Sequence, residues 1–267
     1  MTAREILAAG ELPQREILIL LAHALDVDQA AVYRDLDRPL PAEPLRRIRR
    51  QIARRREGWP LQYLTGQAWF WSRPLQVGRG VLVPRPETET LVEAACRRAP
   101  SGGRLADIGT GSGAILAAIA AERPDLRLVG VERSAVALRF AEQNLDGLAQ
   151  VLQGDLCAPL GEPQSVIVAN LPYVTTDEME ALPRDVQREP RMALLGGKDG
   201  LALIRRLVQD APSHLVPGGW LLLEVGRGQS DAVAQLLERR GFLDIFRQED
   251  LWGVERVVGG RLPCAPS

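Results

Sequence analysis

The fold is indicated most clearly by the stretch Asp107-Ile108-Gly109-Thr110-Gly111-Ser112-Gly113. It follows a short apolar run, residues 104–108, that is typical of a buried strand, and it precedes a run with helical character, residues 114–122. Glycines between a strand and a helix let the backbone turn sharply and approach a ligand closely. The stretch therefore predicts a ligand-binding loop at the carboxyl edge of a sheet.

Strand and helix patterns continue to alternate after this loop. Short apolar runs that predict strands are followed by runs with helical spacing, as in units where a helix connects two parallel strands. Strands are expected over residues 104–108, 126–131, 150–153, 165–169 and 220–225, helices over 114–122, 135–144, 201–211 and 230–240, and two final strands near 242–247 and 253–258. The sequence therefore predicts an α/β fold with a parallel sheet that helices cover on both faces.

The beginning of the chain has a different pattern. It predicts a small helical domain, residues 1–65, with helices over 4–8, 14–25, 30–35 and 44–57. Residues 66–84 carry apolar and aromatic side chains on either side of Gly78-Arg79-Gly80, which predicts a β-hairpin linker that turns at these glycines. The α/β domain would then occupy residues 85–267.

The composition is that of an ordinary globular protein. Of the 267 residues, 46% are hydrophobic and 25% are charged, which argues against a disordered or fibrous chain. The 33 basic and 34 acidic side chains leave a formal net charge of -1, so no overall positive field is present to hold nucleic acid phosphates. We therefore expect no nucleic acid partner, and we expect a monomer.

Cysteine usage and hydropathy favour a cytoplasmic protein. The cysteines Cys96, Cys157 and Cys264 are far apart and form no C-x-x-C pair, so neither a disulfide framework nor a zinc site is indicated. The apolar run over residues 17–25 is too short to span a bilayer, and acidic rather than basic side chains precede it. We expect no membrane span, no export signal and no metal.

Acidic residues at the ends of the next two strands complete a site for a nucleotide-like cofactor. Glu132 ends the strand after the glycine loop, about 20 residues further on, where it would accept hydrogen bonds from ribose hydroxyls. Asp155 ends the third strand, and with Leu156 it would hold an adenine, the carboxylate binding the exocyclic amine and the leucine covering the ring. The loop also matches G-x-G-x-x-A, so a nicotinamide cofactor is an alternative on this evidence.

A second motif, Asn170-Leu171-Pro172-Tyr173, follows the strand at 165–169 and therefore faces the same crevice. The Asn170 side-chain carbonyl and the backbone carbonyl of Leu171 or Pro172 provide two acceptors, which suit a planar NH2 group. The nitrogen of such a group is a poor nucleophile because its lone pair is delocalised, so it has to be polarised and aligned with an electrophile. Pro172 stiffens the turn, and Tyr173 offers a flat face to the target.

S-adenosylmethionine matches both motifs as a cofactor. Its sulfonium methyl group is the required electrophile, and an aromatic face favours the positive charge by ~0.5–2 kcal/mol. The product would be S-adenosylhomocysteine. We expect cofactor contacts from Asp107, Gly109, Thr110, Gly111, Ser112, Gly113, Glu132, Asp155, Leu156 and Asn170, substrate contacts from Asn170, Leu171, Pro172 and Tyr173, and catalysis from Asn170, Pro172 and Tyr173.

These motifs resemble those of the class I S-adenosylmethionine-dependent methyltransferases, and more narrowly the HemK/PrmC family, which methylates glutamine on peptide chain release factors. The resemblance extends over nearly the whole chain. Besides the two motifs above, it rests on Pro60-Leu61-Gln62-Tyr63 with Gly66, Pro84-Arg85-Pro86-Glu87-Thr88-Glu89, Glu189-Pro190, Ala193-Leu194, Gly196-Gly197, Asp199-Gly200-Leu201, and Leu222-Leu223-Glu224-Val225-Gly226 with Gln229.

The resemblance implies a Rossmann-like methyltransferase domain with a seven-stranded, mostly parallel sheet, an N-terminal helical bundle and a β-hairpin linker. It implies that the substrate is the glutamine of the Gly-Gly-Gln motif in class I release factors, methylated at its side-chain amide nitrogen, N5. The family commonly has Asn-Pro-Pro-Tyr, whereas this chain has Leu171 in the second place. The backbone acceptor survives that change.

Other features allow two interpretations. The segment 44–57 carries an arginine cluster that is either a solvated helix face or a contact surface for an acidic partner, since the helical domain resembles the family's docking region. Arg85 and Thr88 either shape the active site or support local structure. The arginine cluster consists of Arg46, Arg47, Arg49, Arg50, Arg54, Arg55 and Arg56.

Three alternative functions remain at this point. The same motifs occur in methyltransferases that act on a ribosomal protein glutamine or on the exocyclic amine of adenine, although the neutral charge and the lack of a recognisable DNA-binding domain weigh against DNA. A nicotinamide-dependent dehydrogenase would lack a credible proton-transfer residue. A binding module that keeps the cofactor pocket for stability alone is the third alternative.

Overall fold

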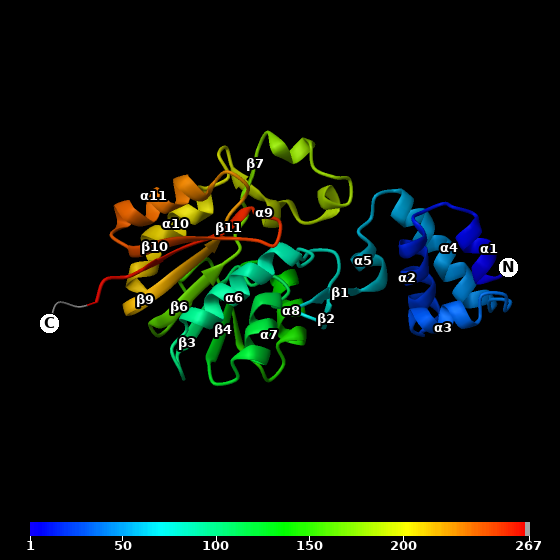
Figure 1. Cartoon of the computed structure of the whole chain (residues 1–267), viewed down its shortest axis with the longest axis horizontal. Helices are drawn as coiled ribbons and strands as arrows, with labels where there is room; N and C mark the ends of the chain where they lie inside the picture. The colour runs from blue at the N-terminus through cyan, green and yellow to red at the C-terminus, as the bar shows by residue number, and fades with distance from the viewer. Residues whose placement is uncertain (265–267) are drawn as a thin grey trace. The chain divides into compact units, whose positions relative to one another are not determined.

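A computed structural model describes residues 1–264 of the chain. The described chain forms two compact units (Figure 1). One comprises Met1–Gln67 together with Pro183–Arg188, and the other comprises the remaining described residues, from Ala68 onward. No helix among residues 1–264 is both long and apolar enough to cross a membrane.

The N-terminal unit is helical. Its helices are α1 (Ala3–Ala8), α2 (Gln14–Leu25), α3 (Gln29–Arg34), α4 (Ala42–Arg56) and α5 (Leu61–Thr65). Helix α1 begins at a capping box, in which the Thr2 hydroxyl accepts from the backbone N–H of Glu5 and the Glu5 carboxylate accepts from that of Thr2. Apolar side chains of α2 and α4, among them Leu20 and Ile48, are fully buried and form the core of this unit.

Residues 183–188 pack with the helical unit through charged groups. Arg55 of α4 binds Glu16 at 2.7 Å and Asp185 at 3.3 Å, and the Arg188 guanidinium lies 5.2 Å from the centre of the Trp59 ring. Arg55 also donates to the backbone carbonyl of Trp59. The boundaries expected from the sequence, 1–65, 66–84 and 85–267, do not anticipate this segment, because ion pairs between distant residues leave no local pattern.

A two-stranded hairpin consists of β1 (Gln67–Phe70) and β2 (Arg73–Gln76). Its turn is at Trp71 and Ser72, with φ angles of 51° and 55°, so the turn predicted at Gly78-Arg79-Gly80 is wrong. Positive φ at two successive turn residues matches the right-handed twist of hairpin strands and normally favours glycine or asparagine. Here tertiary hydrogen bonds hold the turn, since Trp71 donates from its backbone to Glu89 and from its ring to Glu122.

The second unit contains a seven-stranded sheet in the order β10-β11-β9-β6-β3-β4-β5. Its strands are β3 (Arg104–Ile108), β4 (Arg127–Glu132), β5 (Gln150–Gln153), β6 (Gln164–Ala169), β9 (Leu215–Glu224), β10 (Leu243–Glu249) and β11 (Glu255–Arg261). Strands β5, β4, β3, β6 and β9 are parallel, and β11 is antiparallel to both of its neighbours. The expectation of an α/β fold with a mostly parallel, seven-stranded sheet is confirmed.

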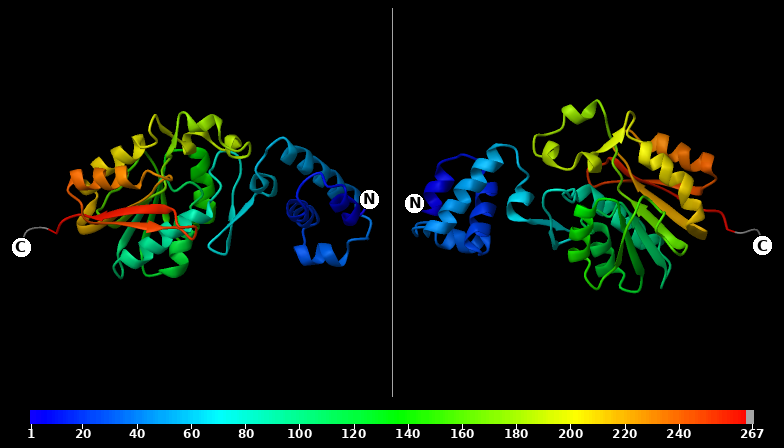
Figure 2. Two further views of the ribbon diagram at one scale, coloured as in Figure 1. Left: turned by 45° about the horizontal axis from the view of Figure 1, so that its top comes forward. Right: turned by 180° about the vertical axis from the view of Figure 1, so that it is seen from behind.

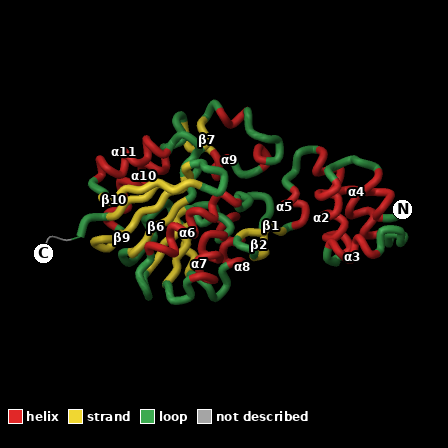
Figure 3. Tube along the Cα trace, in the orientation of Figure 1, coloured by secondary structure: helices red, strands yellow, loops and turns green. Residues whose placement is uncertain are grey.

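Helices cover both faces of this sheet (Figures 2 and 3). Alternate side chains of β6 point to opposite faces, so Val166 and Val168 belong to one apolar core while Ile167 and Ala169 belong to the other. The first core includes side chains of α6 (Glu89–Arg98), α7 (Ala114–Glu122) and α8 (Ala135–Asn144), and the second includes those of α10 (Ala202–Asp210) and α11 (Ser230–Arg240). This arrangement explains why residues 166–169 of the central strand β6 form an uninterrupted apolar, buried run.

Several short elements lie outside the seven-stranded sheet. Strands β7 (Val174–Thr175) and β8 (Leu195–Gly197) form a two-stranded parallel sheet, and α9 (Arg191–Leu194) leads into β8. Single helical turns of the 3-10 type are η1 (Pro86–Thr88), η2 (Glu178–Glu180), η3 (Val186–Arg188) and η4 (Ala211–Ser213). No sequence pattern predicts β7, β8 or α9, because runs this short show no periodicity.

Candidate active site

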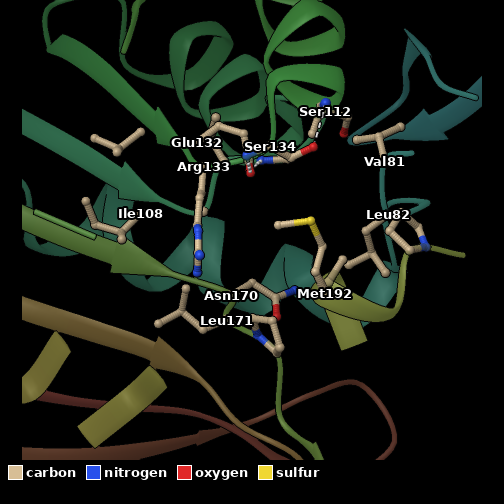
Figure 4. A pocket seen from close by; sticks show the side chains of 18 of the residues that line it. Val81, Leu82, Ile108, Ser112, Glu132, Arg133, Ser134, Asn170, Leu171 and Met192 are labelled. Carbon is tan, nitrogen blue, oxygen red and sulfur yellow. Dashed lines mark hydrogen bonds between the residues drawn. The ribbon is translucent and has the colours of Figure 1, made fainter. Parts of the chain in front are cut away.

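The main pocket of the second unit opens at the carboxyl edge of the parallel strands. It encloses about 1120 Å³, part of which is open to solvent. Ile108 at the end of β3 is paired with Val131 of β4 and with Ala169 of β6, so the loops after these three strands start side by side. Figure 4 shows Glu132 on one side of the pocket and Asn170 on the opposite side. The two sequence motifs therefore meet in one cavity, as predicted.

The glycine loop after β3 depends on backbone angles that other residues rarely adopt. Gly109 and Gly113 have φ angles of 77° and 81°, and a Cβ atom on Gly113 would lie 2.8 Å from the Leu145 side chain. The backbone N–H groups of Gly109 and Thr110 both donate to the carbonyl of Val131, at 2.8 and 3.0 Å. The loop is thereby bound to the neighbouring strand β4, and its backbone lines the pocket without side chains in the way.

Asp107 supports this loop from inside the sheet. Its side chain is fully buried, and Oδ2 accepts a hydrogen bond of 2.7 Å from the Thr110 hydroxyl. Burial raises the pKa of Asp107 to about 7, the hydrogen bond from Thr110 opposes this shift, and the nearby charge of Glu132 adds to it. Asp107 and Gly113 are not among the residues that line the pocket, although both are expected cofactor contacts.

Glu132 lies at the end of β4 with its carboxylate in the pocket wall. It is 8% exposed, and its two oxygens accept from the backbone N–H groups of Gly111 and Ser134, at 2.9 and 2.7 Å. Each carboxylate oxygen has two lone pairs, so both can accept a further hydrogen bond. Glu132 is thus placed to bind hydroxyl groups of a ligand while it shapes the glycine loop.

Asp155 and Leu156 form the next part of the wall, after β5. Leu156 is buried and has a φ of 49°, a left-handed conformation that is unfavourable for leucine and is often found at binding sites. One oxygen of the half-exposed Asp155 carboxylate binds Arg206 at 2.6 Å, which leaves the other oxygen available. An apolar side chain beside a free carboxylate oxygen suits a flat heterocycle that carries an amine.

Asn170, Leu171 and Pro172 line the opposite wall. The Asn170 side chain donates from Nδ2 to the Thr88 hydroxyl at 3.0 Å, which leaves its carbonyl oxygen Oδ1 as the group available to a ligand. The Leu171 side chain is 4% exposed and packs beside Gly109, where an added Cβ would lie 3.1 Å from it. Leu171 therefore connects the two motifs through packing.

Tyr173 is not among the residues that line the pocket. Its backbone carbonyl accepts from the Gln229 side chain at 3.0 Å, and its ring lies beside Gly226, where an added Cβ would be 3.1 Å away. Burial is the main cause that raises the pKa of Tyr173 to about 12, with a smaller contribution from the charge of Glu224. The phenol stays neutral and protonated at physiological pH.

The rest of the pocket lining comes from residues whose role the sequence did not decide or did not indicate at all. Arg85 and Thr88 both line the pocket, and Arg85 binds the buried carboxylate of Glu189 at 2.5 Å. Glu189 also accepts from the backbone N–H of Val83 at 2.9 Å. Pocket residues without a signal in the sequence include Val81, Leu82, Arg133, Ser134 and Met192. Only the tertiary structure brings these residue types, which are common anywhere on a protein, to the site.

In the described part of the chain, no three His, Cys, Asp or Glu side chains are grouped closely enough to hold a metal ion. The pocket instead offers backbone groups, hydrogen-bond acceptors and apolar surface. Such a lining is typical of sites for organic ligands.

Comparisons with known proteins identify the family. The PrmC N-terminal domain matches residues 1–66, and the methyltransferase small domain matches residues 86–186. The release factor glutamine methyltransferase of Geobacter sulfurreducens is 43% identical over 91% of this chain and 87% of its own length. That of Escherichia coli is 38% identical over 96% of this chain and 94% of its own length.

A solved structure supports the fold alone. A methyltransferase from Pyrococcus furiosus superposes with a TM-score of 0.54, at 16% identity over 71% of this chain and 88% of that one. The relatives overturn the nicotinamide alternative that the glycine loop left open. With pocket, fold and relatives in agreement, the chain belongs to the release factor glutamine methyltransferase family.

Proposed function

We propose that this protein transfers a methyl group from S-adenosylmethionine to N5 of the glutamine in the Gly-Gly-Gln motif of class I peptide chain release factors. One observation carries the proposal. The Asn170 amide is tied through Nδ2 to Thr88, so its carbonyl oxygen is left for a substrate NH2 group in the pocket that the glycine loop also lines. The names of the relatives support the substrate.

The residues of the pocket fit S-adenosylmethionine. The Gly109–Gly111 backbone lets the cofactor approach closely, and Glu132 provides acceptors for its ribose hydroxyls. Leu156 provides an apolar cover for the adenine ring, and Asp155 provides an acceptor for its amine. When bound, S-adenosylmethionine supplies an electrophilic methyl group. The protein's part is to hold the methyl group and the target nitrogen in line.

The Asn170 motif binds and orients the target nitrogen. The Oδ1 atom of Asn170 and the backbone carbonyl of Leu171 or Pro172 accept the two N–H groups of the substrate amide. These acceptors favour the positive charge that develops on the nitrogen as its lone pair is drawn out of the amide. No residue has to remove a proton beforehand, since the cationic amide loses its proton readily after transfer. Tyr173 supports the motif from outside the pocket lining.

The proposal includes where the protein acts and which surface binds the release factor. The protein acts in the cytoplasm as a monomer, and the exposed arginines of α4 contact an acidic surface of the release factor. Arg55 is not available for this contact because it binds Glu16 and Asp185, and Arg56 binds Glu11 at 2.8 Å. Arg46, Arg49 and Arg50 are exposed members that we assign to docking. Charge reversal at these three positions should raise KM more than it lowers kcat.

Mass spectrometry of a purified release factor tests the reaction. After incubation with this protein and S-adenosylmethionine, we expect one added methyl group on the glutamine of the Gly-Gly-Gln motif. A release factor with alanine at that glutamine serves as the control and should stay unmodified. Asn170→Ala should abolish turnover but retain cofactor binding by calorimetry. Unmodified release factor, with cofactor binding demonstrated, would contradict the proposal and direct the search to a ribosomal protein glutamine or to adenine.

A further inference from the structure

A fully buried carboxyl group lies directly behind the Asn170 motif. Glu224, the last residue of β9, is 1% exposed, and no donor lies at hydrogen-bond geometry to either carboxylate oxygen. A buried carboxyl group without a full set of partners costs free energy, and its retention calls for an explanation. It is not among the residues that line the pocket.

The sheet places Glu224 next to Asn170. Ala169 of β6 pairs with Leu223 of the parallel strand β9, so Asn170 and Glu224 follow at the same level. Thr88, from the turn η1, is 4% exposed, and with the buried Glu224 and the partly buried Asn170 it completes a group of three polar side chains. Burial raises the pKa of Glu224 to about 7, and the facing Thr88 hydroxyl and Asn170 amide hold it below the value that burial alone would set.

The direction of hydrogen bonding through this group determines how Asn170 is oriented. Asn170 Nδ2 donates to Thr88 Oγ1 at 3.0 Å, so the proton of the Thr88 hydroxyl is left for another acceptor. The two unpartnered oxygens of Glu224 are the acceptors beside it, close enough for the hydroxyl to lower the pKa of the carboxyl group, although neither oxygen has a partner at full hydrogen-bond geometry in this structure. If the Thr88 hydroxyl donated to Asn170 instead, the Asn170 amide would be rotated by about 180° and its NH2 group would face the substrate. Two N–H donors, one from Asn170 and one from the substrate amide, would then oppose each other.

We propose that Glu224 is a positioning residue for methyl transfer, which acts through Thr88 to keep the carbonyl oxygen of Asn170 facing the substrate nitrogen. This inference rests on the proposed function for its effect on turnover, but the orientation of Asn170 is a property of the free protein. The carboxyl group can serve in either protonation state, since each leaves an oxygen able to accept from the Thr88 hydroxyl. Glu224 touches neither substrate nor cofactor in this role.

Glu224→Met tests the proposal by removing both acceptors while it keeps the size and burial of the side chain. We expect kcat to fall by about 10²-fold, because the misoriented amide no longer aligns the target nitrogen, while cofactor affinity stays within about twofold. The midpoint of urea unfolding should not fall, because replacing a poorly paired buried carboxyl group with an apolar side chain is often stabilising. A merely structural role would lower the midpoint instead.

Thr88 provides the second variant and its matched control. Thr88→Val should lower kcat as far as Glu224→Met does, and Thr88→Ser, which keeps the hydroxyl, should restore it to within about threefold. The double variant should lose little more than either single variant, because both remove the same interaction. Losses that simply multiply would overturn the proposed path through Thr88.

Nitrogen-15 NMR tests the orientation without any turnover. The chain has two asparagines, Asn144 and Asn170, so asparagine labelling gives two side-chain amide signals, and Asn170→Ala assigns them. Exchange of the Asn170 side-chain NH2 with water should become at least tenfold faster in Glu224→Met and in Thr88→Val. Asn144, which donates to backbone carbonyls of Gln76 and Ser112, is the internal control.

The two readouts separate this inference from the proposed function. Faster Asn170 exchange in the variants, with no methyl transfer by the unmodified protein, would reject the release-factor substrate but support the role of Glu224. Unchanged exchange in both variants would overturn the inference, whatever the activity.

Discussion

The carboxylate of Glu132 accepts a hydrogen bond from the backbone N–H of Gly111, with 2.9 Å between Oε2 and N. This bond joins the end of β4 to the loop that follows β3. One side chain therefore both shapes the glycine loop and lines the pocket. A substitution of Glu132 should therefore change both the geometry of the glycine loop and the binding of a ligand.

Glu132→Ala should weaken cofactor binding strongly. It removes the acceptor for ribose hydroxyls and releases the loop, and hydrogen bonds to a charged group contribute about 1.5–3 kcal/mol each. We expect the Kd for S-adenosylhomocysteine, measured by calorimetry, to rise by at least about tenfold. Glu142→Ala, at an exposed position of α8 outside the pocket lining, is the matched control. Equal affinities in the two variants would contradict the assigned role.

Gly113→Ala should cost more stability than Gly111→Ala. Both glycines have positive φ, so alanine is strained at either position by roughly 1 kcal/mol. At Gly113 the new Cβ would also lie 2.8 Å from two atoms of the buried Leu145 side chain, whereas at Gly111 its closest neighbour is 3.9 Å away. Urea unfolding measures the difference. A larger loss in Gly111→Ala would contradict the packing described for the loop.

Leu171→Ala should lower both stability and cofactor affinity. The leucine is 4% exposed and belongs to the core that α10 and α11 cover, so truncation should cost about 2–5 kcal/mol of unfolding free energy. Because Leu171 also packs beside Gly109, the loop should loosen and the Kd for S-adenosylhomocysteine should rise. Chemical unfolding and calorimetry check the two effects. A stable variant with normal affinity would show that Leu171 does not connect the motifs.

The stability that two buried carboxyl groups, Asp107 and Glu224, contribute to the protein should fall as the pH rises from about 4 to about 7. In the folded protein burial raises the pKa of Asp107 from 3.8 to about 7, so the folded state keeps a proton that the unfolded chain releases. The raised pKa of the acid therefore favours folding at low pH, and the advantage is lost as the pH increases, by roughly 1.4 kcal/mol per pH unit for one group. Glu224, whose pKa is also raised to about 7, adds to the same trend.

Asp107→Asn isolates the first of these groups. Asparagine still accepts from the Thr110 hydroxyl but does not titrate. Urea unfolding at pH 5, 6, 7 and 8 should show a shallower loss of stability than in the unmodified protein, and a more stable variant at pH 8. An unchanged slope would mean that Asp107 is ionised in the folded protein throughout this range.

Much of the α/β unit could be predicted from local sequence. The expected strands 104–108 and 150–153 and the helices 114–122, 135–144 and 230–240 coincide with β3, β5, α7, α8 and α11. These elements are apolar runs of definite length and period, and neighbouring residues alone create that pattern. Placing the glycine loop and Asn170 at one edge needed only the further rule that parallel strands share their direction.

Features that depend on distant residues escaped prediction. The hairpin turns at Trp71 and Ser72 because Glu89 and Glu122 hold the tryptophan, whereas the glycines at 78 and 80 were the stronger local signal. The segment 183–188 packs with the helical unit through Arg55, and no periodic pattern in the sequence predicts this contact.

The sequence by itself determined the order of strands and helices and the chemical types gathered at the pocket, because both follow from short stretches of chain. Only the tertiary structure decided which way Asn170 presents its amide. Its partner Thr88 is 82 residues away in sequence, and Glu224 comes from a different strand. Hydrophobic patterns specify which side chains are buried, but the pairing of buried polar groups is set by strand register and by the approach of separate elements.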